Sequence, residues 1–302
     1  MLKTNEVRLV IQSVIGEVTS PRVRTPPYRV STEGVPVVLP GTGGITFNVR
    51  VGDPAFGWAA DHVEPGVSAR NRESKEGYGP ENEGFNCLSC VGNEAVVVTG
   101  GAKGEKGRVT GKHGGIEHVL IDFGWKVLDR MVVGDKIQVR AHGQGLKILD
   151  QPAVTVMNLD PGLLHLMGCR VDARRNLHVP VVCRVPPVLM GSGVGSTSAY
   201  SGDYDITTAD KALISHLGID KLRFGDIVAI DDHDSSYGRA FRRGAVTIGA
   251  VIHSDCVLAG HGPGVTALMT SKEGKIVPEL HPAANIARYL GLRKDVFGRK
   301  PR

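Results

Sequence analysis

No stretch of this sequence approaches eighteen consecutive apolar residues, the length that a membrane-crossing helix requires. The amino-terminal segment, MLKTNEVRLVIQSVIGEV, lacks the apolar core of a secretory signal peptide, because Asn5, Glu6 and Arg8 interrupt it. The five cysteines are an odd number, which does not indicate a disulfide framework. We therefore expect a cytoplasmic protein with reduced thiols and no membrane partner.

Aromatic residues are scarce, at 5% of the chain, and the sequence contains no aromatic-studded RNA-binding motif. The formal net charge is +5, and part of this excess lies in the last ten residues. The basic residues there are Arg293, Lys294, Arg299, Lys300 and Arg302. A short basic tail without a recognition helix is typical of a solvated terminus, so we expect no nucleic-acid partner.

Motifs for a structural metal or a nucleotide are also missing. Cys87 and Cys90 form a single CxxC, whereas a structural zinc site needs four ligands. A thioredoxin-like role would require a βαβ context that the sequence does not show. The segment 100–115, GGAKGEKGRVTGKHGG, lacks the GxxxxGK(S/T) spacing of a P-loop. We expect ordinary thiols and no nucleotide cofactor.

Glycine, in contrast, is abundant: its 40 residues are about twice the usual share. Without a collagen-like period, this content indicates many tight turns and close approaches between strands. Strand-like runs are short and numerous, and convincing helices are few. The sequence therefore predicts a mainly β protein with a few helices, a β-rich α+β fold with two β-lobes. We place the lobes at residues 1–160 and 161–302, the second with a short carboxyl-terminal helix.

The strand-like runs lie at residues 7–18, 45–51, 95–99, 118–123, 136–141, 154–157, 177–185, 227–231, 245–253 and 265–269. Helices are expected at 208–217, after a cap at Thr207 or Thr208, at 283–290, and near Trp125. Segment 100–115 is expected to be a long loop.

Two segments resemble each other internally. Residues 129–142 read DRMVVGDKIQVRAH, and residues 220–233 read DKLRFGDIVAIDDH. Each contains a Gly-Asp pair, typical of a turn, and then an alternating run, typical of a half-buried strand. Chance or reuse of a common turn explains this similarity as well as a duplication does.

The segment 229–265 has the highest density of side chains that can carry chemistry. It reads AIDDHDSSYGRAFRRGAVTIGAVIHSDCVLAGHGPGV, with acids and histidines at two strand ends and in a glycine-rich loop. Strand ends and loops are where a rigid scaffold presents catalytic groups. The candidate catalytic residues are Asp232, His233, His253, Asp255, Cys256 and His261.

Three interpretations of this segment remain open. Imidazoles and carboxylates are the usual ligands of catalytic zinc or a similar divalent metal. The metal-ligand candidates are His233, His253, His261 and Asp232. In the second interpretation, His253 or His261 activates Cys256 as a nucleophile. In the third, the acids and histidines only satisfy turn backbone groups. His62, beside Asp61, is a weaker candidate for the same cleft.

Substrate-binding candidates come from other segments. Lys103, Lys112 and His113 belong to the segment that we expect to form a mobile loop, where they would hold an anion such as phosphate or carboxylate. Arg239 follows the first strand of the segment 229–265, and Asp205 follows a Gly-Asp turn.

The strings DDHDSSYGR, VIHSDCVLAGHGPGV, GAKGEKGRVTGKHGG and DHVEPGVS make the chain resemble the bacterial and archaeal family known as domain of unknown function 4438. The resemblance extends over about residues 62–271 and implies a two-part, β-rich protein, with no established activity. A fainter similarity is to the acetamidase/formamidase family, in which Asp205 would stand at the position of the catalytic acid. That family's histidine is absent, because Gly195, Ser196 and Thr197 occupy its neighbourhood.

Together these features lead us to expect a metal-assisted, amidase-like hydrolase of a small polar or anionic metabolite. The alternatives are a non-catalytic metabolite-binding or sensing protein and an oligomeric structural protein. A small-molecule ligand and further copies of the same chain, in a homo-oligomer, are the expected partners.

Overall fold

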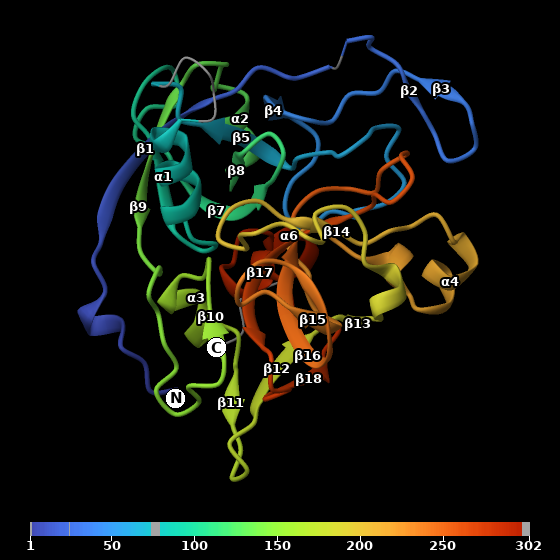
Figure 1. Ribbon diagram of the computed structural model, residues 1–302. Helices are drawn as coiled ribbons and strands as arrows, with labels where there is room; N and C mark the ends of the chain where they lie inside the picture. The colour runs from blue at the N-terminus through green and yellow to red at the C-terminus, as the bar shows by residue number, and fades with distance from the viewer. Residues whose placement is uncertain (1, 24, 74–78, 298–302) are drawn as a thin grey trace.

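Figure 1 shows the computed structural model, which describes residues 2–23, 25–73 and 79–297. The chain is mainly β: two large sheets dominate, and the helices are short. This confirms the fold class predicted from the glycine content and the short strand-like runs. Residues 298–302, which include part of the basic tail, lie outside the described residues.

Six antiparallel strands of the amino-terminal half form a closed barrel. β1 pairs with β9 on one side and with β5 on the other, so the order β1-β9-β6-β7-β8-β5 returns to its first strand. Closure leaves no free edge in this ring. The bounds are β1 (Gln12–Val18), β4 (Ile45–Thr46), β5 (Gly66–Arg70), β6 (Glu94–Val97), β7 (Lys106–His113), β8 (His118–Asp122) and β9 (Lys136–Ala141); β4 pairs with β5 outside the ring.

The second large sheet belongs to the carboxyl-terminal half and has the order β10-β17-β16-β15-β13, with β14 also paired to β17. Its bounds are β10 (Thr155–Val156), β13 (Cys183–Val185), β14 (Tyr204–Asp205), β15 (Ile227–Asp234), β16 (Ala240–Val251) and β17 (Gly264–Ser271). Smaller sheets contain β11 (Arg170–Val171), β12 (Leu177–Val181) and β18 (Ile276–Leu280), and β2 (Arg29–Val30) with β3 (Pro36–Val37).

Three of the helices, α3, α4 and α5, begin at short polar side chains that cap them, whereas α1 and α2 begin at glycines. Asp160 accepts from Gly162 N and Leu163 N at the start of α3, and Asn285 accepts from Ala287 N at the start of α5. Asp210 caps α4, so the expected cap at Thr207 or Thr208 is wrong. The bounds are α1 (Pro80–Leu88), α2 (Trp125–Leu128), α3 (Pro161–Leu166), α4 (Lys211–His216), α5 (Ile286–Tyr289) and α6 (Lys294–Phe297), with 3-10 turns η1 (Glu6–Arg8), η2 (Pro187–Leu189) and η3 (Ile219–Lys221).

The expected loop at residues 100–115 is wrong over most of its length. Residues 106–113 form β7, which pairs with both β6 and β8 inside the barrel. Likewise, the run 177–185 is not one strand but two, β12 and β13, in different sheets. In both places long-range pairing, which local composition does not reveal, decides the structure.

The two segments that resemble each other adopt the same local structure. Gly134 and Gly225 have positive φ, at 91° and 85°. The carboxylates of Asp135 and Asp226 then accept from Val132 N and Arg223 N, three residues back. A strand follows each turn: β9 in the barrel and β15 in the second sheet.

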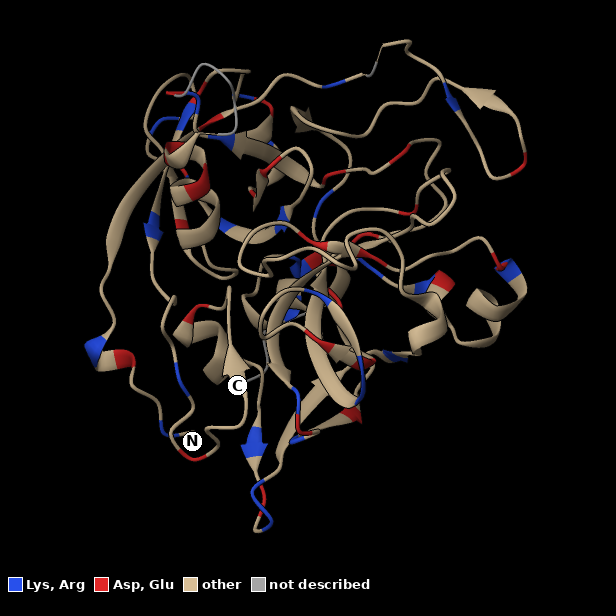
Figure 2. Ribbon diagram, in the orientation of Figure 1, with Lys and Arg blue, Asp and Glu red and all other residues tan. Residues whose placement is uncertain are grey.

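Charged residues are spread along the chain. Lys and Arg alternate with Asp and Glu over both halves rather than gathering on one element (Figure 2). Among the described residues, no helix is both long and apolar enough to cross a membrane.

The barrel meets the second sheet at Gly111. A register irregularity in β7 lies between Val109 and Gly111, and a Cβ at Gly111 would overlap the side chain of Ile252. One residue further on, Lys112 N donates to Thr266 Oγ1 at 3.0 Å, and this hydroxyl lies 3.0 Å from Lys112 O. Leu120, Ile252 and Leu268 belong to the shared hydrophobic core. This contact places the end of β7, His113, against the second sheet.

Lys112 secures the same junction. Its side chain is fully buried, and its amine donates to Cys87 O, Asn158 Oδ1 and Tyr200 O at 3.1, 2.8 and 2.7 Å. Burial lowers the pKa of this amine to about 8. All three donors of the ammonium group are used. The amine therefore ties three separate segments together and has no donor left for a substrate, unlike the role expected from the sequence.

Gly111→Ala should lower the free energy of unfolding by about 1–3 kcal/mol, because the added methyl group overpacks the interface against Ile252. Gly84→Ala is the matched control, since a Cβ there meets nothing within 4 Å. Urea denaturation of both variants measures the difference. Equal stability of Gly111→Ala and the parent protein would contradict the close approach.

Lys112→Met should cost about 3 kcal/mol of stability, because three buried oxygens lose a charged donor. Lys103→Met, in the exposed turn between β6 and β7, should change stability by less than about 0.5 kcal/mol. Thermal and urea melts compare the two. If Lys112→Met were as stable as Lys103→Met, the three hydrogen bonds of the Lys112 amine would not stabilise the junction.

Candidate functional site

Four histidines from both halves of the chain meet where the barrel touches the second sheet. His62 precedes β5 and has a φ of 50°, and His113 ends β7. His253 follows β16, and His261 lies in the glycine-rich loop before β17. The ring centroid of His62 lies 5.7 Å from that of His113, 4.8 Å from that of His253 and 5.2 Å from that of His261, and His113 and His253 are 4.5 Å apart. Neither half alone contains this cluster.

Two carboxylates complete the cluster. Asp203 and Asp205 flank Tyr204 and, because strand residues alternate, point to the same side of β14. His253 Nε2 lies 3.0 Å from Asp203 Oδ2 and 3.3 Å from Asp205 Oδ1, and His261 Nδ1 lies 2.6 Å from Asp205 Oδ2. A Cβ on Gly264 would overlap both Asp203 Oδ2 and His253 Nε2, so this position requires glycine.

Two of the histidines, His113 and His253, have a hydrogen-bond acceptor at Nδ1, which leaves Nε2 for the cluster, and the Nδ1 of His62 has an ion-pair contact. His113 Nδ1 bonds Glu64 Oε1, and His253 Nδ1 lies 2.9 Å from Ser254 O. Gly264 N also approaches His253 Nδ1, at 3.3 Å, but a carbonyl can only accept, and its shorter contact indicates that Nδ1 carries the proton. His62 Nδ1 lies 3.2 Å from Asp61 Oδ1. Metal-binding histidines are oriented in this way.

Glu64 lies behind His113 and is fully buried. It accepts from Gly43 N at 2.6 Å and Ser68 Oγ at 2.5 Å, and His118 Nδ1 lies 3.0 Å away. Burial favours the neutral acid, but His118 and His113 outweigh it and hold the pKa of Glu64 well below its usual range. Glu64 is therefore an anion that fixes the ring of His113.

Polar atoms at the centre of the cluster lack hydrogen bonds of good geometry. Within the part of the chain that the structure describes, Asp203 Oδ2 and His253 Nε2 are both buried without such a partner. The ligand atoms of His62, His113 and His253 all lie within 4.8 Å of one another, as do those of Asp203, Asp205 and His253. His253 Nε2 and Asp203 Oδ2 lie 3.0 Å apart without the alignment of a hydrogen bond. Burial favours the neutral imidazole, but the two carboxylates outweigh it and raise the pKa of His253 well above its usual range, so this arrangement fits a shared cation.

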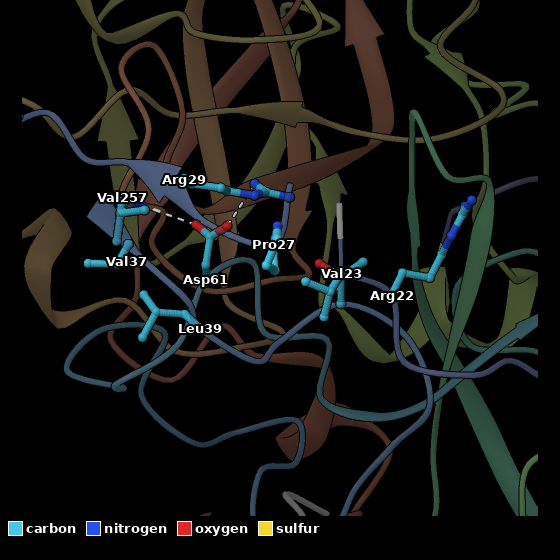
Figure 3. A pocket seen from close by; sticks show the side chains of 9 residues that line it. Arg22, Val23, Pro27, Arg29, Val37, Leu39, Asp61 and Val257 are labelled. Atoms are coloured by element: carbon cyan, nitrogen blue, oxygen red, sulfur yellow. Dashed lines mark hydrogen bonds and ion pairs between the residues drawn. The ribbon is translucent and has the colours of Figure 1, made fainter. Parts of the chain in front are cut away.

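The cluster lies in the wall of a cavity of ≈ 590 Å³, a size typical of small-molecule sites. His62, His113, His261, Asp203 and Asp205 face it together with Arg239, and the glycine-rich segments around Gly114 and Gly193 form other parts of its wall. An adjoining smaller hollow is drawn in Figure 3. There, Asp61 forms an ion pair with Arg29 at 2.7 Å and accepts from Val257 N at 3.2 Å.

Asp232 and His233, two of the four predicted metal ligands, do not join this cluster. β15 and β16 are antiparallel, so His233, near the end of β15, and His253, after the end of β16, lie at opposite ends of the pair. His233 Nδ1 contacts Thr247 Oγ1 at 3.1 Å, and burial lowers the pKa of its imidazole to about 4. Its ring stacks on Tyr204, which points to the other face of β14 from Asp203 and Asp205. Asp232 Oδ1 accepts from Gly244 N at 2.7 Å.

Asp255 and Cys256 follow His253 closely in sequence, and Cys256 Sγ lies within 4.8 Å of ligand atoms of His62 and His261, but neither residue is suited to its predicted catalytic role. Asp255 accepts from Thr208 Oγ1 at 2.5 Å, pairs with Lys211 at 3.3 Å and lines a different hollow. Burial and the Asp61 carboxylate raise the pKa of the Cys256 thiol above its ordinary value, which disfavours the nucleophilic thiolate.

Among the predicted substrate-binding residues, His113, Asp205 and Arg239 line the cavity. Lys103 lies in the exposed turn between β6 and β7, and Lys112 is buried in the tie described above. Sequence reasoning missed Asp203, Glu64 and His118. The repeated acids in Gly202–Asp205 and the DHVE string were the available signals, but neither has a spacing specific for a metal.

Family models match residues 28–165 and 161–290, respectively to the amino-terminal and carboxyl-terminal parts of the family described as Domain of unknown function (DUF4438). The crystal structure of TM1086 resembles this structure with a TM-score of 0.89 and 52% sequence identity, covering 95% of this chain and 99% of that chain. A search of curated proteins gave no match. The matched residues span both halves of the molecule and the whole histidine cluster, and the chain therefore belongs to the DUF4438 family.

Proposed function

We infer that this protein is a metal-dependent hydrolase of a small polar or anionic molecule. The observation that carries this proposal is the convergence of three histidines on two buried carboxylates beside a cavity. His113 and His253 each have a hydrogen-bond acceptor at Nδ1, and His62 Nδ1 lies 3.2 Å from the Asp61 carboxylate. The bound metal would be zinc or a similar divalent ion, because imidazole and carboxylate are the ligands that such ions prefer.

The residues divide into two roles. His62, His113 and His253, whose ligand atoms lie within 4.8 Å of one another, would hold the ion. Asp203, whose Oδ2 lies 3.0 Å from His253 Nε2, would be the fourth ligand. Asp205, already paired with His261 at 2.6 Å, would accept a proton from water. The metal would lower the pKa of that water and polarise the substrate carbonyl. In an amidase-like reaction the water oxygen bonds to the carbonyl carbon, the C–N bond breaks, and the Asp205–His261 pair passes the proton to the departing amine.

A non-catalytic binding protein is a weaker proposal for the same cavity. It would suit a pocket whose polar groups are all hydrogen-bonded, whereas Asp203 Oδ2 and His253 Nε2, although 3.0 Å apart, make no well-aligned hydrogen bond among the described residues. Homo-oligomeric assembly and a cytoplasmic location stay predictions from the sequence.

Protein purified without chelator should contain about one equivalent of zinc, manganese or iron per chain, measured by elemental analysis. His113→Ala and His253→Ala should each lower this content at least about tenfold, because each removes a ligand. His216→Ala, on the exposed side of α4, should leave it unchanged. A metal-free parent protein that also takes up no added zinc would refute the metal site.

Hydrolysis of a panel of small amides and esters should stop on chelation and resume when the metal is restored. Activity should rise from acidic to neutral pH, since the ligand imidazoles must be neutral and the bound water must lose a proton. His261→Ala should lower kcat by about 10²–10⁴ while the metal content stays as in the parent protein, because His261 moves a proton and does not hold the ion. Unchanged turnover in His261→Ala would exclude its assigned role.

A further inference from the structure

Arg239 carries a buried charge that nothing near it neutralises by contact. It immediately precedes β16, is 5% exposed and lines the same cavity as the histidine cluster. Its Nη2 donates to Ser201 O at 2.7 Å. Its Nε is buried without a hydrogen-bond partner, and no carboxylate lies within 4.0 Å of the guanidinium among the residues that the structure describes. Buried charges are normally paired, so we expect an anion to bind this guanidinium.

Three acids lie near Arg239; of these, Glu117, whose pKa is raised by burial, has an Oε2 that is buried without a hydrogen-bond partner. Asp203 and Asp205 contact His253, and Asp205 also contacts His261. Glu117 Oε1 accepts from Gly115 N at 3.2 Å. These three carboxylates influence Arg239 only from beyond ion-pair distance.

The backbone holds Arg239 rigidly in the cavity wall. Arg239 N donates to Ser196 O at 2.9 Å, and Gly195 N donates to Arg239 O at 2.7 Å. Gly238, at a φ of 108°, allows this contact because a Cβ there would overlap Ser196 O. A cation fixed by its own backbone loses little conformational freedom when it binds an anion.

We propose that the substrate carries one carboxylate, that Arg239 receives this group, and that the bond to be hydrolysed then lies toward the histidine cluster. Only the position of the hydrolysed bond rests on the proposed hydrolase function; the binding of a carboxylate by Arg239 does not. A guanidinium matches the planar carboxylate with two parallel hydrogen bonds. A phosphate dianion would favour a second buried cation, but Arg29 is paired with Asp61 at 2.7 Å, and Arg22, the remaining arginine of the lining, is exposed to solvent. The substrate class is therefore a small acylamino acid or a similar carboxylate-bearing amide.

The test uses N-trifluoroacetylglycine as a probe, followed by ¹⁹F NMR, with its methyl ester as the neutral counterpart. The carboxylate should bind at least about tenfold more tightly than the ester, and Arg239→Gln should remove this preference. Arg239→Lys should bind at intermediate strength, since it keeps the charge but not the paired donors. Arg243→Gln changes an exposed arginine on β16, four residues after Arg239; it is the control for charge and should change the affinity less than about twofold.

Repeating the titration after chelation separates this inference from the hydrolase proposal. Binding that depends on Arg239 and survives chelation supports the carboxylate site even if no metal or turnover is found. Binding that is lost on chelation but kept in Arg239→Gln places the carboxylate on the metal and overturns the inference, while the metal site stands. Equal binding of acid and ester, or no binding of either at millimolar concentration, also overturns it. The ester comparison needs no variant, so poor folding of Arg239→Gln does not leave the question open.

Discussion

The contact between β7 and the second sheet at Gly111 is the constraint on which the rest of the structure depends. Only a residue without a side chain allows the barrel strand to approach Ile252, and the Lys112–Thr266 hydrogen bonds then fix the register. His113 follows immediately on one strand, and His253 lies one residue beyond Ile252 on the other. The geometry of the cluster is thus set by backbone packing rather than by flexible side chains, which is what a preorganised site requires.

This interface is costly to form, because it buries histidines and carboxylates together. Glu64 stabilises the arrangement through four hydrogen bonds or ion-pair contacts, one of them with His113. Ser254 O contacts His253, and Asp61 contacts His62. The desolvation cost that hydrogen bonds do not offset lies mainly at Asp203 Oδ2 and His253 Nε2. Buried polar atoms that lie 3.0 Å apart without a well-aligned hydrogen bond, beside a cavity and within an otherwise well-bonded network, are typical of a site built to receive a ligand.

Sequence reasoning succeeded where the information is local. Alternation over Lys136–Ala141 predicted β9 at its full length, and the strand ends near His253 and His261 identified two members of the cluster.

Prediction from the sequence failed where strand pairing is long-range. β7 is rich in glycine and lysine and has no apolar alternation of its own; the barrel makes it a strand. His62 contacts His261 across 199 residues of sequence, and no local pattern encodes that distance. The error at His233 was avoidable, since consecutive antiparallel strands end at opposite edges.

Neighbouring residues at β14 point to opposite faces of the strand and therefore contact different parts of the structure. Asp203 and Asp205 face the histidines, while Tyr204 between them turns to the opposite side and packs on His233. His233 therefore helps to position the carboxylates although it cannot reach the cluster. The proposed ligands come from β7, the loop before β5, the residue before β14 and the loop after β16. An ion that binds them would therefore favour the docked state of both halves over any state in which they separate. Metal binding and docking of the two halves are then thermodynamically linked: the bound ion stabilises the docked state, and docking raises the affinity for the ion.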